Sequence, residues 1–328
     1  MIQLGRKRVK QLLKEFRNKK VLILGDLMLD RYLWGQVSRL SPEAPVPVVE
    51  IEKEYSRLGG AANVGNNILS LGAVPYLVGL VGADNSGREL ISILEESQFP
   101  SEGIIVDGNR PTTVKTRVIA HTQHVVRTDR EVRTPISPEI EERVRATLDR
   151  LLPQMDGVIL EDYNKGLLTP SLIQYAIARS KELGKIVTVD PKFDNFFAYR
   201  GVTVFKPNRR EVEMALGVRL QNRDDIAHAA ETLFRRLECE CLLITLGEDG
   251  MALFNSRNEA RFVPTRARKV HDVSGAGDTV ISTLTLALTA GASFEEAASL
   301  ANHAAGIVCG EVGIVPITPE ALVEGMFG

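Results

Sequence analysis

The segment DVSGAGDT (272–279) places a carboxylate directly behind a turn of small residues. A helix can begin near Ala276, because the uncharged run TVISTLTLALTAG follows and Gly291 suits its end. Helix N-termini bind anions through free N–H groups and the positive dipole end, and glycines allow close approach. Asp278 could then accept a proton from a hydroxyl that attacks a phosphoryl group held there. A tight turn whose acid favours the helix dipole explains the pattern equally well.

Other polar residues follow predicted strands, where α/β sheets bind their ligands. Asp26 and Asp30 lie in GDLMLDRYLWG (25–35), after the first strand. Their carboxylates could accept hydrogen bonds from sugar hydroxyls, or they could cap a loop. In LGGAANVGNN (58–67), Asn63 and the nearby backbone could contact a sugar. A helix start with small residues for close packing is the alternative.

The segment KPNRREVE (206–213) places Asn208 three residues before Glu211. We interpret this spacing as a pair of oxygen ligands facing magnesium-bound phosphate, commonly through water, because it fits a capping box less well. A purely structural role is the alternative. By contrast, SFEE (293–296) is a good capping box that needs no further role. A P-loop is excluded, because no G-x-x-x-x-G-K-[ST] pattern occurs.

Composition excludes several classes of protein. The 328 residues are 44% hydrophobic and 25% charged with a net charge of −2, as in a soluble globular protein that neither nucleic acid nor a membrane attracts. The longest uncharged run, 279–294, is too short to cross a bilayer, and the basic N-terminal stretch reads as an amphipathic helix. Cys239, Cys241 and Cys309 lack zinc-ligand spacing. Cys239 and Cys241 alternate at the edge of an apolar strand, so we expect two buried thiols in a reducing, cytoplasmic compartment.

Short apolar runs alternate with amphipathic segments, which predicts an α/β domain with a parallel sheet covered by helices on both faces. Predicted strands are 21–25, 74–82, 157–160, 185–190, 202–208 and 241–247, and predicted helices include 137–152, 171–184 and 224–237. Two extended segments, 45–59 and 110–131, break the alternation and predict a small inserted β lid. Apolar alternates in the first of them suggest that one lid packs on another in a homodimer: Val46, Val48, Val49 and Ile51.

Together these motifs resemble the ribokinase-type (PfkB) carbohydrate kinase family. The family's two signatures, GG-x-x-x-N and D-T/V-x-G-A-G-D-T, correspond to the segment beginning at Gly59 and to residues 272–279, and the resemblance covers nearly the whole chain. It implies a ribokinase-like α/β fold, with a mainly parallel central sheet flanked by helices and a small β-sheet lid. We expect a single kinase domain over residues 1–328. No nucleotidyltransferase domain is expected, because no H-x-G-H motif occurs.

Further segments resemble the kinase domain of the bacterial heptose enzymes of lipopolysaccharide-core synthesis: 26–35, 38–50, 110–120, 161–166 and 189–192. That resemblance implies ATP- and Mg²⁺-dependent phosphorylation of D-glycero-β-D-manno-heptose 7-phosphate at C1, on the route to ADP-heptose. Two alternatives stay open. One is a kinase for another sugar or sugar phosphate, such as fructose 1- or 6-phosphate, and the other is a non-catalytic sugar-binding relative.

The resemblance also implies roles for individual residues. Asp278 matches the catalytic base, and the N–H groups of Gly275, Ala276 and Gly277 match the anion hole. Asn208 and Glu211 match the magnesium-organising N-x-x-E motif, and the nucleotide positions are Asn208, Arg209, Arg210, Glu211, Thr245, Gly247 and Asn302. Sugar-binding positions are Asp30, Gly59, Gly60 and Asn63. Relatives often bind K⁺ beside the anion hole, where Asp272 and the GEVG loop (310–313) would lie.

A substrate with a second phosphate needs cationic donors at its far end. The candidates are Lys115, Arg117, Lys165 and Lys192, each of which could instead be an ordinary exposed cation. For His121 and His124 we expect exposed strand positions without a metal, because they lack a ligand partner at suitable spacing. The lid would cover the sugar and exclude water.

Overall fold

The computed structural model describes residues 4–121, 123–255, 260–265, 273–311, 313 and 315–328. Its main sheet has nine strands in the order β13-β12-β11-β10-β9-β8-β1-β4-β5. Neighbouring strands in this order are parallel from β11 to β5. At the other edge, β12 pairs antiparallel with β11, and β13 pairs antiparallel with β12. Their bounds are β1 Lys20–Gly25, β4 Val74–Gly82, β5 Ile104–Asp107, β8 Gly157–Glu161, β9 Ile186–Asp190, β10 Val204–Phe205, β11 Cys241–Thr245, β12 Met251–Asn255 and β13 Ala260–Val263.

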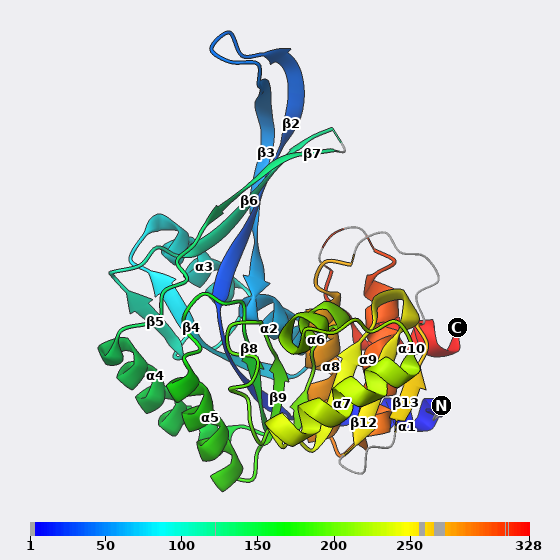
Figure 1. Cartoon of the computed structure of the whole chain (residues 1–328). Helices are drawn as coiled ribbons and strands as arrows, with labels where there is room; N and C mark the ends of the chain where they lie inside the picture. Colours follow the sequence, from blue (N-terminus) through cyan, green and yellow to red (C-terminus); the bar gives the residue numbers. More distant parts are fainter. Residues whose placement is uncertain (1–3, 122, 256–259, 266–272, 312, 314) are drawn as a thin grey trace.

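Helices cover both faces of this sheet (Figure 1). Residues of α1 (Arg6–Phe16), α2 (Ala61–Ser70), α3 (Asn85–Glu96), α8 (Ala276–Thr289), α9 (Phe294–Val308) and α10 (Pro319–Phe327) belong to one core. Those of α4 (Pro138–Leu151), α5 (Pro170–Glu182), α6 (Arg209–Leu216) and α7 (Arg223–Leu237) belong to the other. The prediction of a parallel sheet between two helical layers is therefore confirmed.

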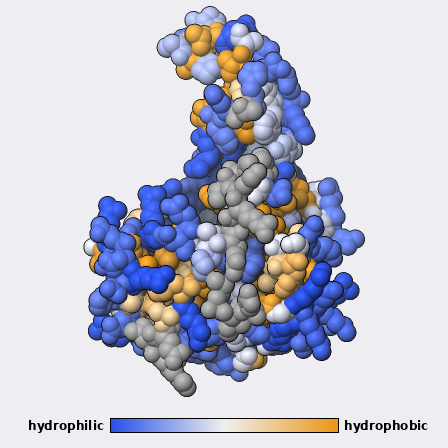
Figure 2. Space-filling view, turned by 90° about the vertical axis from the view of Figure 1, so that its right-hand side faces the viewer, coloured by the Kyte–Doolittle hydropathy of each residue, from blue (hydrophilic) through white to orange (hydrophobic). Residues whose placement is uncertain are grey.

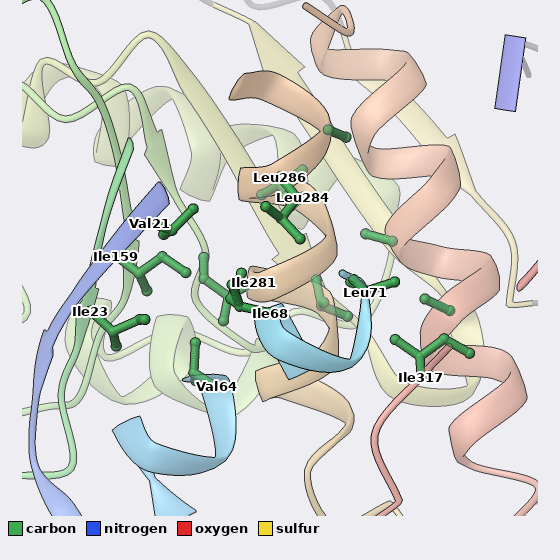
Figure 3. Packing of buried hydrophobic residues seen from close by; sticks show 14 of the residues in the cluster. Val21, Ile23, Val64, Ile68, Leu71, Ile159, Ile281, Leu284, Leu286 and Ile317 are labelled. Carbon is green, nitrogen blue, oxygen red and sulfur yellow. The ribbon is translucent and has the colours of Figure 1, made fainter. Parts of the chain in front are cut away.

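The central strand shows why two cores form. Val21 and Ile23 pack into one core, and Leu22 and Leu24 pack into the other, because successive strand side chains point to opposite faces. Ile68 of α2 faces Ile281 of α8 on the first of these sides (Figure 3). A strand buried on both faces is uniformly apolar, and this is why VLILG was recognisable as one.

A second sheet of four strands, in the order β3-β2-β6-β7, forms the lid, which projects from the body in Figure 1. Its strands are β2 Leu27–Leu40, β3 Pro47–Gly60, β6 Thr113–Ala120 and β7 Gln123–Arg130. The predicted lid segments correspond to β3, β6 and β7. The sequence reading missed β2, because residues 27–30 are all buried and show no polar alternation.

Several local predictions can be compared with the structure. Ser137 caps α4 by accepting a hydrogen bond from the N–H of Ile140, and Gly291 follows α8 with φ 81°. The strand predicted at 202–208 is only two residues long. The three cysteines are buried thiols, as predicted for Cys239 and Cys241. His121 and His124 are exposed as predicted, but His121 lies in the turn after β6, with φ 54°, and not in a strand. Within the described residues, no helix has both the length and the apolar character that crossing a membrane requires.

Candidate active site

The candidate catalytic carboxylate, Asp278, lies in the first turn of α8, and only 6% of its surface is exposed. Two donors hold its two oxygens. The side-chain amide of Asn63 donates to Oδ2 at 2.5 Å, and the hydroxyl of Tyr163 donates to Oδ1 at 2.9 Å. Asn63 belongs to α2, and Tyr163 follows β8, so the carboxylate joins two distant segments to α8. Such a carboxylate is fixed in orientation before any substrate binds.

Burial raises the pKa of Asp278 to about 6, while the hydrogen bonds from Asn63 and Tyr163 oppose the shift. Burial also raises the pKa of the Tyr163 phenol well above its usual range, so this hydroxyl stays protonated and can donate. The carboxylate is therefore ionised at neutral pH but is a stronger proton acceptor than an ordinary aspartate. This is the property that a general base requires.

Glu161 and Asp190 end strands β8 and β9 beside Asp278. One carboxylate oxygen from each of the three residues lies within 4.8 Å of the others. Asp190 pairs with Lys206 at 2.7 Å, whereas both oxygens of the fully buried Glu161 lack a hydrogen-bond partner among the described residues. Burial and the neighbouring carboxylates raise the pKa of Glu161 well above its usual range. Unsatisfied hard oxygen donors of this kind fit a divalent cation such as Mg²⁺.

The glycine turn before α8 has the geometry of an anion site. Gly275 adopts the left-handed conformation, with φ 78°, and caps the helix. A Cβ on Gly277 would lie 3.5 Å from Oδ2 of Asp190 and 3.8 Å from Nζ of Lys206, so it would enter the space beside these charges. The N–H of Gly277 belongs to the first helical turn and has no intrahelical acceptor. The N–H of Ala276, by contrast, donates to the carbonyl of Val273 at 3.2 Å in this structure.

A cavity of about 990 Å³ opens on this turn and is large enough for a nucleotide. Asp278 and the glycine turn line it together with predicted nucleotide positions: Asn208, Arg209, Arg210, Thr245, Gly247 and Asn302. Asn208 and Thr245 are also joined by a parallel β-bridge. The structure therefore brings these predicted nucleotide residues and the candidate base to one space.

The interpretation of Asn208 and Glu211 was wrong in one respect. The two residues form a complete capping box at the start of α6: Asn208 Oδ1 accepts from the N–H of Glu211, and Glu211 Oε2 accepts from the N–H of Asn208. The other oxygen of Glu211 contacts Lys192 at 2.7 Å. The pKa of Lys192 is raised by Asp190 and Glu211, although burial opposes the shift. Lys192 thus belongs to the nucleotide side of the site, where it also lines the cavity.

The glycine pair before α2 allows two backbones to pass closely. A Cβ on Gly59 would lie 2.5 Å from Oδ2 of Asp30, and one on Gly60 would lie 2.5 Å from the carbonyl of Asp26. Gly60 also has φ 57°, which favours glycine. Asp30, from β2, pairs with Arg117 of β6 at 2.5 Å.

Asp26 organises the loop after β8. Its Oδ2 accepts hydrogen bonds from the N–H groups of Tyr163 and Lys165, at 2.9 and 3.0 Å. Burial raises the pKa of Asp26 to about 6, and the nearby charge of Asp162 adds to the shift. Of its two predicted roles, the structure thus shows loop capping for this oxygen.

Lys115 and Lys165 meet at a carboxylate that sequence reasoning did not single out, Glu131. It also missed Glu161, Tyr163, Asp190 and Lys206 as members of the site. The available signal was their position at or just beyond strand ends. Asp272, predicted to bind K⁺, and part of the GEVG loop lie outside the described residues.

Comparison with known proteins adds relatives of two kinds. The family model described as pfkB family carbohydrate kinase matches residues 18–321. The chain is 46% identical over 307 residues to "Bifunctional protein HldE" of Desulfatibacillum aliphaticivorans, covering 94% of this chain and 63% of that protein. It is 41% identical over 323 residues to the protein of the same name from Syntrophotalea carbinolica, covering 98% and 66%. The chain therefore spans a little under two thirds of the length of these curated relatives.

Solved structures share the fold. The structure of Arabidopsis thaliana ribokinase complexed with ribose and ATP matches with a TM-score of 0.75 at 18% identity, covering 95% of this chain and 99% of that one. Escherichia coli phosphofructokinase-2 in complex with potassium matches with a TM-score of 0.76 at 17% identity, covering 94% and 98%. At these identities the likeness is one of fold.

Proposed function

The chain belongs to the pfkB family of carbohydrate kinases, and on this premise we propose that it phosphorylates D-glycero-β-D-manno-heptose 7-phosphate at C1 with ATP. The product would be the 1,7-bisphosphate, on the route to ADP-heptose and the lipopolysaccharide core. The segments that resemble bacterial heptose enzymes support this substrate, as do the relatives named "Bifunctional protein HldE". We also propose a cytoplasmic location, which the buried thiols of Cys239 and Cys241 support.

The observation that carries the proposal is the oriented carboxylate of Asp278 at the edge of a cavity that also holds a glycine turn and a helix N-terminus. Asp278 takes the proton of the C1 hydroxyl while the oxygen of that hydroxyl forms a bond to the γ-phosphorus. The bond from that phosphorus to the ADP oxygen breaks, and ADP leaves. The N–H groups at the start of α8 and the ammonium of Lys206 stabilise charge on the transferring group.

Mg²⁺ bound with ATP would neutralise charge on the phosphates, and Glu161 and Asp190, with Asn208 and Glu211 through water, are the residues that would hold it. The two buried oxygens of Glu161, which lack a hydrogen-bond partner among the described residues, support this assignment. A K⁺ site beside Asp272 remains a prediction, because Asp272 lies outside the described residues.

A substrate panel tests the proposal. ADP release is measured with heptose 7-phosphate, fructose 1-phosphate, fructose 6-phosphate, ribose and adenosine, each at several concentrations. We expect the highest kcat/KM with heptose 7-phosphate. A higher value with any other sugar would contradict the proposed substrate, and calorimetric sugar binding without ADP release would support a non-catalytic relative instead.

A further inference from the structure

Two lysines and an arginine converge on the carboxylate of Glu131, directly after β7. We propose that Lys115, Lys165 and Arg133 form the subsite for the remote phosphate of the sugar phosphate, and that Glu131 occupies this subsite until the substrate displaces it. The inference rests on the proposed function, because it assumes a substrate that carries a phosphate away from its acceptor hydroxyl.

The donors around Glu131 are arranged as a phosphate would require. Oε2 lies 2.8 Å from Nζ of Lys165 and 3.4 Å from Nζ of Lys115, so one oxygen bridges two ammonium groups. Oε1 lies 2.8 Å from Nη2 of Arg133. Only 11% of the side-chain surface of Glu131 and of Lys165 is exposed, and 17% of that of Lys115, so these charges interact more strongly than at an open surface. Phosphate oxygens accept from the same donors.

The cluster is joined to Asp278 by the loop after β8. Asp26 binds the N–H groups of both Tyr163 and Lys165, so the residue that contacts Asp278 and the residue that contacts Glu131 are tied to one carboxylate. The side chain of Tyr163 contacts the candidate base, and the side chain of Lys165 contacts Glu131 in the cationic cluster.

The lid joins the same two places from its own side. Gly59 of β3 packs on Asp30, and Asp30 lies opposite Lys115 in the β2–β6 register. Helix α2 follows β3 directly and carries Asn63, which donates to Asp278. Directly paired residues point to the same face of a sheet, so Lys115 and Asp30 share a face of the lid. A sugar that presents its hydroxyl to Asp278 between the lid and the β8 loop would carry its far end toward Glu131.

The other candidate cations are committed elsewhere. Lys192 pairs with Glu211 and lines the nucleotide cavity, and Arg117 pairs with Asp30. Asp129 shares Lys115 with Glu131, at 3.2 Å from Nζ. Of the four predicted cations, Lys115 and Lys165 are therefore the best match to a dianion, and the structure adds Arg133, which sequence reasoning did not single out.

The loop that carries Glu131 is anchored just beyond it. Residues 134–136 of its loop are anchored to the β8 loop, because Arg110 donates to the carbonyls of Lys165 and Thr134 and the N–H of Ile136 donates to the carbonyl of Gly166. Although burial opposes it, hydrogen bonds from Lys165 and Arg133 lower the pKa of Glu131 to about 2, so the group is an anion at neutral pH. A phosphate dianion offers these cations twice the charge of the carboxylate that it replaces.

The test compares KM and kcat of wild type, Glu131→Gln, Lys165→Gln and Lys115→Gln for heptose 7-phosphate and for the unphosphorylated heptose. We expect Glu131→Gln to lower KM for the phosphorylated sugar about 3- to 10-fold, because the internal anion is gone. Each lysine variant should raise that KM about 10-fold or more. KM for the unphosphorylated sugar and for ATP should not change.

Glu102→Gln is the matched control, because Glu102 is an exposed carboxylate that pairs with Arg150 away from the lid. Thermal unfolding of each variant shows whether it is folded, and Lys115→Gln provides a less buried alternative to Lys165→Gln. An unchanged or raised KM in Glu131→Gln, or equal shifts for both sugars, would overturn the inference while leaving the proposed function intact. If the panel shows another sugar phosphate to be the substrate, the proposed function fails, and the same comparison with that sugar and its unphosphorylated form decides the inference.

Discussion

Asp278 combines features that a purely structural carboxylate would avoid. It is buried, and the pKa of its side chain is raised to about 6 mainly by that burial. In the folded state it therefore binds more protons than in the unfolded state between about pH 4 and pH 6, and the free energy of unfolding falls as the pH rises through that window. Burial thus disfavours the ionised form, which is the form that the proposed mechanism uses. A buried carboxylate with a raised pKa at the edge of a cavity is a candidate catalytic group.

Glu161 and Tyr163, which surround Asp278, have different roles in the site. Glu161 has no hydrogen-bond partner among the described residues for either oxygen, which leaves it available to a cation. Tyr163 donates to Asp278 through its hydroxyl, and its N–H donates to Asp26. Tyr163 therefore orients the candidate base and also anchors its own loop after β8.

The start of α8 is the element on which phosphoryl transfer depends. Its second residue, Gly277, faces Asp190 and Lys206 across ordinary contact distances, so a methyl group would fit in the ligand-free protein. The same methyl group would stand where a transferring phosphoryl group must approach the backbone. A methyl group added at Gly277 should therefore impair catalysis without impairing folding.

We expect Gly277→Ala to fold at least as stably as wild type, with a gain of up to about 0.5 kcal/mol from helix propensity. Its kcat/KM for ATP should fall roughly 10- to 100-fold, because the phosphoryl group is displaced from its position. Chemical unfolding and steady-state kinetics measure the two effects. Gly5→Ala is a suitable control, since nothing lies within 4 Å of the added Cβ at that helix cap. A folded Gly277→Ala enzyme with wild-type kcat/KM would show that the turn does not hold the phosphoryl group.

Much of the element order could be predicted from the sequence, because buried parallel strands are uniformly apolar and helix caps follow local rules. SFEE forms the predicted capping box. The same rules explain the error at Asn208, where a local capping box and a ligand pair have the same spacing. The lid strand β2 was missed because its first four residues are buried like those of a core strand.

The site itself could be predicted only in part. Asp278 and the glycines carry a local pattern, whereas Tyr163 and Glu131 reach their partners through tertiary contacts over long separations in sequence. The hydrogen bond between Tyr163 and Asp278 spans 115 residues. Glu131 meets Lys165 only because the lid returns to the β8 loop. The periodicity of a single sequence does not predict such long-range tertiary contacts.

At the scale of the whole molecule, the lid extends away from the body and presents apolar side chains among polar ones (Figure 2). Leu40, Val46, Ile51 and Val126 are each about half exposed or more. We propose that two copies of the chain pack through their lids as a homodimer. Exposed apolar residues grouped on one projecting sheet support this arrangement.

We expect the wild-type chain to sediment as a two-chain species and the double variant Ile51→Lys, Val126→Lys to sediment as one chain, because buried lysines would be unpaired in the interface. Analytical ultracentrifugation measures this directly. Val218→Lys, at an exposed site outside the lid, should stay dimeric. A monomeric wild type, or a double variant that remains dimeric, would contradict the proposed interface.

The most direct test of the account is the turnover of Asp278→Asn. This change keeps the size of the side chain but removes the base. We predict that kcat falls by about 10²- to 10⁴-fold, while calorimetry shows ATP bound as tightly as in wild type. Turnover close to the wild-type value in a folded Asp278→Asn protein would contradict the central claim that this carboxylate deprotonates the sugar.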